Sequence, residues 1–293
     1  MSASTAPREE TLPAPANPLG WISIYLELGK ARLNSFVVLT AVVGYAVAAR
    51  GEWQLATLAW TTLGTALSAC GANGLNQLLE ADRDRLMERT RGRPLPSGRI
   101  GATHALLVSM GGVAAGFLLL AFAVNPLTGF LSLFVTALYV LVYTPLKTRT
   151  ILNTAVGAVC GGIPPMMGWA AATGGLEPGA WVLGAILFNW QIPHFLALAW
   201  MYREDYARGG YRMLPQIDGE RGTFTCYAAL AHSLLTVPIA LAASWLALGG
   251  WVYTGGAILL GGLMVAASLD LLRHRTRDAA RRVFLASLIY LPV

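Results

Sequence analysis

The sequence predicts an all-α protein that crosses a membrane about nine times. Of its 293 residues, 55% are hydrophobic and only 12% are charged, whereas about a quarter of the residues in a soluble domain are charged. So few charged side chains cannot cover a soluble globule of this size, which excludes a soluble single domain. Long apolar stretches, separated by connections of two alternating kinds, support the same conclusion.

Nine stretches approach the length of about 20 apolar residues that a helix needs to cross the hydrocarbon core. The last stretch is the shortest, and whether its helix is complete is left open. Residues 1–20 are rich in Ala, Pro, Ser and Thr, which is typical of a disordered tail, and residues 21–293 are expected to form a single transmembrane domain. In chain order the predicted spans are 23–49, 53–79, 102–124, 126–146, 151–172, 180–201, 223–248, 251–272 and 279–293.

The connections between these spans predict the orientation in the membrane. The charged connections and the amino-terminal tail, with the adjoining helix ends, hold all of the 21 Lys and Arg residues except Arg50. Basic residues gather on the cytoplasmic side of membrane proteins, so the amino terminus is predicted to be cytoplasmic, in a bacterial-type inner membrane. The charged connections are 81–101, 147–150, 202–222 and 273–278, and they alternate with the nearly uncharged 125–126, 173–179 and 249–250.

Polar side chains continue the second span into the first long charged connection. No helix breaker precedes Gly92, so the helix is predicted to extend to about Arg89. On this helix Asn76, Glu80 and Asp84 form one stripe. Carboxylates at the end of a buried helix are unfavourable unless paired or metal-bound, and Mg²⁺ is usually held by one or two carboxylates plus substrate phosphates. Because arginines that can bind phosphate follow at once, the stripe predicts a diphosphate site rather than a solvated loop.

A second polar cluster, residues 189–206, ends the sixth span. His194 and Asp205 are eleven residues apart, which places them on one face of a continuous helix. Asp205 is therefore predicted to bring a further acid to the site. Glu80 and Glu204 are separated by four spans, and this interval hints at two related four-helix halves that share one cavity.

A third element lies at the end of the fourth span, where Tyr143 and Lys147 are one helical turn apart. Lys147 could neutralise a phosphate and Tyr143 could donate to it, although a snorkelling lysine beside an interfacial tyrosine is common in membrane proteins. The candidate catalytic and metal-binding residues are Asn76, Glu80, Asp84 and Asp205. The candidate diphosphate-binding residues are Arg89, Arg93, Tyr143, Lys147, Arg149 and Arg203.

Four stretches, residues 76–95, 143–149, 161–169 and 190–206, together carry a family resemblance. They resemble the UbiA-type intramembrane prenyltransferases, and within them the protoheme IX farnesyltransferase (haem O synthase) group. The likeness extends from about residue 20 to the end. Glu80 stands where Asp is more usual in this family, which keeps the charge and adds one methylene group.

The resemblance implies helices around a central cavity that opens laterally to lipid. Farnesyl diphosphate would bind at the cytoplasmic end, on Mg²⁺ held by acids such as Glu80, Asp84 and Asp205. Departure of diphosphate would leave an allylic cation, which a vinyl group of haem B would capture before water completes haem O. His194 would be either an axial ligand of the haem or a hydrogen-bonding side chain in the cavity. Direct hand-off of the product to a downstream haem enzyme is left open.

Two other functions are compatible with these residues. Prenyl transfer to an aromatic quinone precursor would use the same diphosphate site, because charge patterns do not define the acceptor. A transporter or a non-catalytic haem-handling protein also keeps acids within the membrane, usually near the midplane. Here both acidic clusters lie at one end of their helices and are followed by arginines, which favours a polar headgroup bound at the membrane surface.

Overall fold

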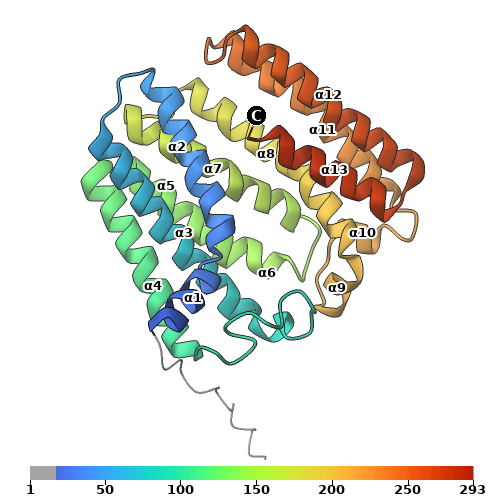
Figure 1. Ribbon diagram of the computed structural model, residues 1–293, viewed down its shortest axis with the longest axis horizontal. Helices are drawn as coiled ribbons and strands as arrows, with labels where there is room; N and C mark the ends of the chain where they lie inside the picture. The colour runs from blue at the N-terminus through green and yellow to red at the C-terminus, as the bar shows by residue number, and fades with distance from the viewer. Residues whose placement is uncertain (1–17, 293) are drawn as a thin grey trace, which may run out of the picture.

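The structure is a computed structural model that describes residues 18–292 (Figure 1). Most of the predicted tail, residues 1–20, lies outside the described residues, and residues 18–20 already belong to the first helix. The described residues form helices and no strand. The helices are α1 (Pro18–Leu28), α2 (Ala31–Ala49), α3 (Leu55–Asp84), α4 (Ala102–Leu119), α5 (Pro126–Ala137), α6 (Thr144–Leu146), α7 (Asn153–Thr173), α8 (Pro178–Met201), α9 (Arg203–Arg208), α10 (Leu214–Ile217), α11 (Thr223–Trp245), α12 (Trp251–His274) and α13 (Arg277–Tyr290). The π-helical turns η1 (Leu120–Val124) and η2 (Leu138–Tyr143) extend α4 and α5.

Seven helical segments are long and apolar enough to cross a membrane, and they confirm an all-α membrane protein. Five of them are the single helices α2, α7, α8, α11 and α12. The sixth joins α4 to η1, and the seventh joins α5, η2 and α6. The two other predicted spans correspond to α3 and α13, which are not among these seven, so the count of nine is not confirmed. The 30-residue α3 carries many polar side chains, and α13 has 14 residues, or about 21 Å at 1.5 Å per residue.

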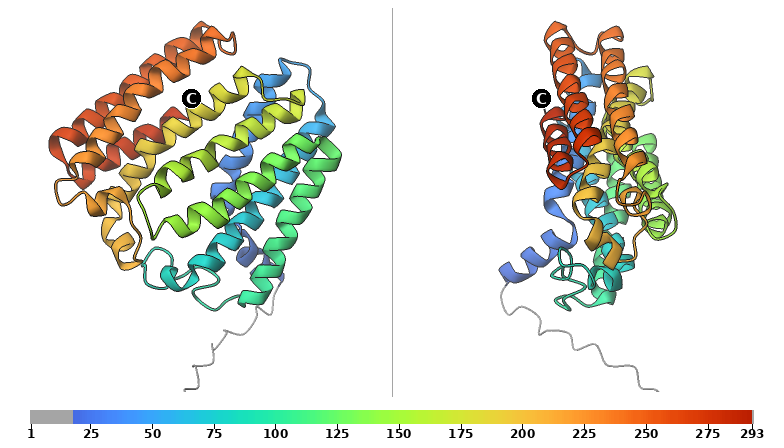
Figure 2. Two further views of the ribbon diagram at one scale, coloured as in Figure 1. Left: turned by 180° about the vertical axis from the view of Figure 1, so that it is seen from behind. Right: turned by 90° about the vertical axis from the view of Figure 1, so that its right-hand side faces the viewer.

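The helices form two bundles that meet where α7 packs on α8. Helices α2, α3 and α5 pack on α7, α2 also packs on α3, α4 packs on α3 and α5, and α6 packs on α3. In the other bundle α11 and α13 pack on α8, and α12 packs on both of them. Figures 1 and 2 show that α2 and α13, from opposite ends of the chain, lie on the same face of the molecule. The short helices α1, α6, α9 and α10 lie at one end of the bundle. A sequence relationship between the two halves and a central cavity stay predictions.

Glycines allow α7 to approach its neighbours closely. A Cβ atom on Gly168 would overlap the backbone carbonyl of Ala41 on α2, and one on Gly44 would overlap the carbonyl of Pro165 on α7. Small residues of this kind let helix backbones touch inside membranes. Gly168 of α7 and Gly44 of α2 therefore fix the position of α7 against α2, and α7 also packs on α3.

Two predicted helices are interrupted or shorter than expected. The predicted span 23–49 breaks at Gly29 and Lys30, between α1 and α2. Helix α3 ends at Asp84 rather than near Arg89, because the chain folds back and the Thr90 hydroxyl donates to the Asp84 carbonyl at 3.0 Å. These two irregular segments lie on either side of the polar end of α3.

The predicted continuous helix through the second cluster is also wrong. Helix α8 ends at Met201, and Tyr202, with φ −116° and ψ 26°, separates it from α9. Asp205 on α9 accepts a hydrogen bond from the backbone N–H of Glu88 at 3.0 Å, which draws α9 toward the segment after α3. His194 and Asp205 therefore do not share one helix face.

Candidate active site

One face of α3 carries polar side chains into the bundle. Asn76 and Asp84 are fully buried and Glu80 is 4% exposed, and Asn73 one turn earlier is also buried. The spacing of three and four residues places all four on the same face, as the sequence predicts. Buried carboxylates require charged or hydrogen-bonding partners, and the neighbouring elements supply them.

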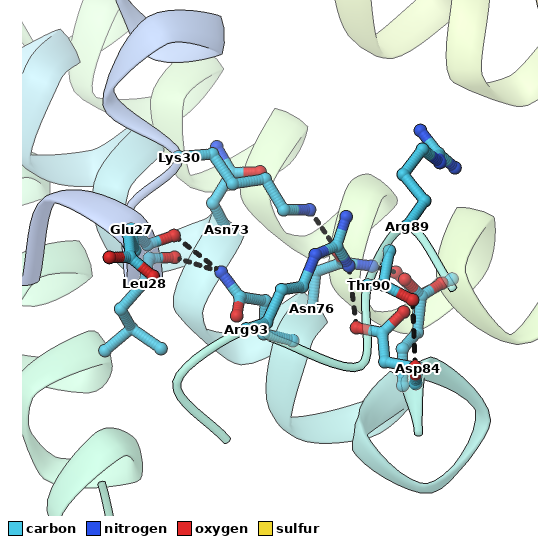
Figure 3. A network of polar contacts seen from close by, with 12 residues as sticks. Glu27, Leu28, Lys30, Asn73, Asn76, Asp84, Arg89, Thr90 and Arg93 are labelled. Atoms are coloured by element: carbon cyan, nitrogen blue, oxygen red, sulfur yellow. Dashed lines mark hydrogen bonds and ion pairs between the residues drawn. The ribbon is translucent and has the colours of Figure 1, made fainter. Parts of the chain in front are cut away.

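Each acid on α3 has a cation of its own. Lys147 Nζ, just after α6, lies 2.8 Å from Glu80 Oε1, and Arg93, in the segment after α3, lies 2.6 Å from Asp84 Oδ2. Figure 3 shows Arg93 and Thr90 beside Asp84. Two of the predicted diphosphate-binding residues are thus brought to the predicted acids. Burial lowers the pKa of Lys147, but the Glu80 carboxylate and the neighbouring tyrosines together outweigh burial and hold that pKa well above its usual value.

Lys30 is a third cation near the acids, and the sequence pattern did not predict it there. Its Nζ donates to Asn76 Oδ1 at 2.7 Å (Figure 3). The Asn76 side-chain amide donates to Thr144 Oγ1 at 2.9 Å. Burial, with the nearby Arg93 charge, lowers the pKa of Lys30 to about 7. A basic residue directly after Gly29, between two apolar segments, is the sequence signal that could have identified it.

The backbone at Lys30 is held in a strained conformation. Its φ of 50° and ψ of 56° lie in the left-handed region, which is unfavourable by about 1–2 kcal/mol for a residue with a side chain. The fully buried Gln77 amide donates to the carbonyls of Glu27 and Leu28 at 2.9 and 2.8 Å. These bonds satisfy the end of α1 and fix the turn that aims Lys30 at Asn76. Strain of this kind is typical of functional sites.

Tyrosines surround Lys147. Its Nζ lies 4.7 Å from the centre of the Tyr143 ring and 5.7 Å from that of Tyr211, both within the range of cation–π contacts. Tyr139 stacks on Tyr143 and donates to Asn73 at 3.2 Å. Burial, with the nearby Glu80 carboxylate, raises the pKa of Tyr211. Tyr143 is therefore close to the acids as predicted, and Tyr211 is an addition that the sequence did not indicate.

Asp205 is buried but has a separate set of partners. Its Oδ1 accepts from the Glu88 backbone N–H at 3.0 Å and from Arg208 at 3.1 Å. Among residues 18–292, no three His, Cys, Asp or Glu side chains lie close enough together to hold a metal ion. The structure therefore does not gather Asp205 with Glu80 and Asp84 into one metal-binding group, and its role as a metal ligand stays a prediction.

The other predicted arginines lie outside the acid cluster. Arg89 is exposed and lies over the rings of Tyr202 and Tyr206 at 5.2 and 5.4 Å. Arg203 donates to the Gly219 carbonyl at 3.4 Å, and Arg149 is exposed. All three lie at the same end of the bundle, but their contact with a diphosphate stays a prediction.

His194 lies on α8 and contacts α13 rather than the acids. Its Nδ1 is 2.8 Å from Ser287 Oγ, and its ring stacks between those of Trp190 and Phe284. The expectation that His194 faces Asp205 is therefore wrong. The break at Tyr202, which turns α9 out of line with α8, is the physical reason.

The donor set on α3 fits Mg²⁺ with a bound phosphate. Asp84 Oδ1 is fully buried and has no hydrogen-bond partner in the described part of the chain, although Oδ2 is paired with Arg93. The Glu80 carboxylate lies one turn before Asp84 on the same face of α3, and the side-chain oxygen of Asn76 lies two turns before Asp84. These are the hard oxygen ligands that Mg²⁺ prefers, and phosphate oxygens and water usually complete its octahedron.

A sequence model described as the UbiA prenyltransferase family matches residues 37–290. The chain belongs to this family. It is therefore a membrane prenyltransferase, and the polar end of α3 is its candidate active site. The family assignment confirms the resemblance that the four stretches of sequence carry.

Relatives within the UbiA family are similar over most of this chain. The protoheme IX farnesyltransferase of Solibacter usitatus is 40% identical, with 92% of this chain and 95% of the relative covered. The human mitochondrial protoheme IX farnesyltransferase is also 40% identical over 92% of this chain, which spans 60% of that longer protein. The protein of the same name from Anaeromyxobacter dehalogenans is 40% identical over all of this chain and 97% of its own length.

Solved UbiA-type structures share the fold. A digeranylgeranylglyceryl phosphate synthase superposes with a TM-score of 0.78 at 18% identity, covering 92% of this chain and 94% of the other. A UbiA homologue from Archaeoglobus fulgidus, solved with DMAPP and Mg²⁺, superposes with a TM-score of 0.66 at 16% identity, covering 92% and 99%. At these identities the likeness establishes the arrangement of the helices alone.

Proposed function

We propose that this chain transfers the farnesyl group of farnesyl diphosphate to a vinyl group of protohaem IX (haem B), with hydration, to give haem O. The observation that carries the proposal is the 40% identity to protoheme IX farnesyltransferases over at least nine-tenths of the chain. The buried cluster of acids and cations at the end of α3 is consistent with the diphosphate half of this reaction. The farnesyl chain would lie among the apolar helices.

The charges at the site are suited to one diphosphate with one divalent cation. Lys30, Lys147 and Arg93 contribute three positive charges, and Glu80 and Asp84 contribute two negative ones. The cluster therefore has a net charge of about +1 when all five are ionised. A divalent cation and a diphosphate ester with about three negative charges bring the sum close to zero, which buried sites favour.

Each residue of the cluster then has a definable part in substrate binding. Asn76, Glu80 and Asp84 would hold Mg²⁺ through their side-chain oxygens. When bound, the ion supplies Lewis-acid stabilisation of the leaving diphosphate. Lys30 and Lys147 are already desolvated and aimed into the cluster, so they can bind phosphate oxygens with little reorganisation. Asp205, paired with Arg208, would add a third acid near the diphosphate.

The transfer itself needs charge stabilisation and exclusion of water more than a strong base. As the carbon–oxygen bond of farnesyl diphosphate breaks, negative charge grows on the diphosphate that the cations surround. The allylic cation left behind is attacked by the vinyl double bond of haem B. A water molecule then adds to the new cation beside the macrocycle and releases a proton. The apolar walls of the helices keep other water molecules away until the carbon–carbon bond has formed.

The orientation in the membrane is part of the proposal. The α3 cluster, the 85–101 segment and α9 lie at the end where the basic residues gather. The positive-inside rule places that end in the cytoplasm. The amino terminus and the active site would then be cytoplasmic, in the inner membrane of a bacterial-type cell, where a prenyl diphosphate made in solution has direct access.

A turnover assay tests the proposal. The protein in nanodiscs is supplied with haem B, farnesyl diphosphate and Mg²⁺, and mass spectrometry follows a farnesylated, hydrated haem. We expect this product, and its loss with EDTA. If an aromatic quinone precursor is modified and haem is not, the acceptor of the farnesyl group is that precursor rather than haem B. No turnover with either acceptor from well-folded protein would point to a haem-handling or transport role instead.

A further inference from the structure

His194 is held in one orientation by aromatic rings from two helices. The Trp190 ring, one turn earlier on α8, stacks on it with centroids 5.2 Å apart and planes inclined by 25°. The Phe284 ring of α13 stacks on it at 4.8 Å and 28°. The Trp190 indole N–H in turn donates to the Ser287 carbonyl at 2.7 Å, which ties the ring stack to α13. The plane of the imidazole is therefore fixed.

Ser287 determines which nitrogen of this imidazole carries the proton. Its Oγ lies 2.6 Å from the Phe284 carbonyl oxygen and 2.8 Å from His194 Nδ1. A hydroxyl group has one proton to donate and a carbonyl can only accept. Ser287 therefore donates to Phe284 and accepts from an Nδ1–H of His194. In this neutral tautomer the lone pair of the imidazole is on Nε2.

The Nε2 atom of His194 has no hydrogen-bond partner among the described residues. The His194 side chain is only half-buried. Gln191, three residues earlier on α8, lies beside Gly161 of α7, whereas Trp190 contacts α13. Because residues three and four apart share a helix face, His194 lies on the face of α8 between α7 and α13. The lone pair of His194 Nε2 is therefore located at the junction of the two helix bundles.

We propose that His194 Nε2 is an axial ligand of the iron of the haem substrate. Histidines that bind metals nearly always donate their other N–H to an acceptor that fixes tautomer and ring orientation. The chain from His194 Nδ1 through Ser287 Oγ to the Phe284 carbonyl has this form. Ser287 and Phe284 are positioning residues, because they act through His194. This inference rests on the proposed function, since it takes haem B to be the acceptor.

The depth of His194 in the bundle agrees with this role. It lies seven residues before the end of α8 at Met201, or about 10 Å along the helix at 1.5 Å per residue. The diphosphate cluster is at that same end. A haem whose iron is held at His194 can direct one edge of its macrocycle, where the vinyl groups are, toward the diphosphate end. The reacting carbons then meet between the two sites.

Haem binding without turnover tests the inference. The full-length protein in nanodiscs is loaded with haem B in the absence of any prenyl diphosphate, reduced, and examined by resonance Raman spectroscopy. We expect an iron–histidine stretching band that shifts when the protein carries ¹⁵N-labelled histidine. This measurement uses the unaltered chain, so it does not depend on the folding of any variant. Bound haem without a histidine band would overturn the inference.

Variants identify which histidine is the ligand. His194→Ala is expected to lose the band, and added imidazole is expected to restore it by entering the space left behind. His232→Ala is the matched control, because His232 is also half-buried in a helix and its Nδ1 is hydrogen-bonded, to Asn189 at 2.8 Å. It should keep the band unchanged. Retention of the band in His194→Ala would overturn the inference.

The variant Ser287→Ala separates orientation from packing. It removes the acceptor for Nδ1–H and leaves the ring stack in place, so we expect the iron–histidine band to shift to lower frequency and haem affinity to fall about 10-fold or more. An unshifted band and unchanged affinity would show that Ser287 does not position His194, contrary to the inference. Failure of the unaltered protein to bind haem would overturn the proposed function together with it. Haem O formation without a histidine band would overturn the inference alone.

Discussion

The two carboxylate oxygens of Asp84 are in different surroundings, and this difference defines what the residue can do. Oδ2 is paired with Arg93 at 2.6 Å, whereas Oδ1 is fully buried without a partner among the residues described. A buried anionic oxygen without a partner is unfavourable in the ligand-free protein. Binding of a cation at Oδ1 would remove that penalty, as expected for the proposed metal site.

Asp84→Asn should therefore abolish turnover while the protein still inserts into the membrane. The amide keeps the shape but removes the charge that Arg93 and the cation require, and loss of one such electrostatic contact lowers kcat by about 100-fold or more. Turnover per folded molecule, measured after size-exclusion chromatography, checks this expectation. Asp82→Asn is the matched control, because the Asp82 side chain is 96% exposed, and it should stay within about twofold of the unaltered protein. Full activity of Asp84→Asn would contradict the metal assignment.

Lys30 offers a way to separate function from stability at one position. Lys30→Gly removes the amine that reaches Asn76 but suits the left-handed backbone, which disfavours any other residue by about 1–2 kcal/mol. We expect thermal stability to be unchanged or higher. Affinity for farnesyl diphosphate should fall about 10-fold or more, since a hydrogen bond to a charged group contributes about 1.5–3 kcal/mol.

Calorimetric titration with a non-hydrolysable farnesyl diphosphate analogue measures that affinity for the Lys30→Gly protein. Arg32→Gln is the control, because Arg32 is an exposed cation in the next turn of the chain. It should bind the analogue as the unaltered protein does. Equal affinity of Lys30→Gly and Arg32→Gln would exclude Lys30 from the diphosphate site.

At the scale of helices, the acids and their cations come from different elements. Glu80 and Asp84 belong to α3, whereas Lys30 precedes α2, Lys147 follows α6 and Arg93 lies in the segment before α4. In the ligand-free site these cations compete with Mg²⁺ for the carboxylates. A diphosphate gives the cations another anion to bind and so frees the acids. Metal and diphosphate binding are therefore expected to reinforce each other.

We predict that Mg²⁺ binds about 10-fold or more tightly when the farnesyl diphosphate analogue is present, and that the analogue gains the same factor from Mg²⁺, because linkage is reciprocal. Titration of each ligand in the presence and absence of the other measures both factors. EDTA should accordingly weaken binding of the analogue as well as stop turnover. Equal Mg²⁺ affinity with and without the analogue would show that the pairing seen on α3 does not compete with the metal.

The contact between α2 and α7 makes a second prediction about elements. Gly168→Ala would place a methyl group against the Ala41 carbonyl, and neither backbone can move without shifting a whole helix. We expect a loss of about 1–3 kcal/mol, seen as a lower melting temperature in detergent. Gly255→Ala on α12 has nothing within 4 Å of the added carbon and should melt at the same temperature or higher. Similar melting of the two variants would show that close packing does not depend on Gly168.

For the whole molecule, the sequence predicted those features that a single helix or the membrane controls. Periodicity alone placed Asn76, Glu80 and Asp84 on one buried face, and hydropathy located the seven confirmed spans. It did not predict Lys30, whose position depends on Gln77 satisfying the end of α1 from another helix. It also placed His194 beside Asp205, since nothing local in residues 194–205 signals that Glu88 draws α9 out of line with α8.

The orientation of the whole molecule yields the last prediction. Within residues 18–292, every basic residue except Arg50 is at the end of the bundle that we assign to the cytoplasm, and two exposed glutamates mark the two ends. Glu52 lies in the turn between α2 and α3, and Glu220 lies in the segment before α11. Cysteine at either position replaces an exposed carboxylate, so the fold is expected to tolerate both changes equally.

Glu52→Cys should react with a membrane-impermeant maleimide in intact cells, whereas Glu220→Cys should react only after the inner membrane is permeabilised. The unaltered protein gives the background of the three native cysteines, which lie within helices α3, α7 and α11. We expect this labelling pattern because the opposite orientation would require many Lys and Arg side chains to cross the hydrocarbon core, and the free-energy cost of each is on the order of several kcal/mol. The opposite labelling pattern would place the diphosphate site outside the cytoplasm and would overturn both the orientation and the proposed access of the substrate.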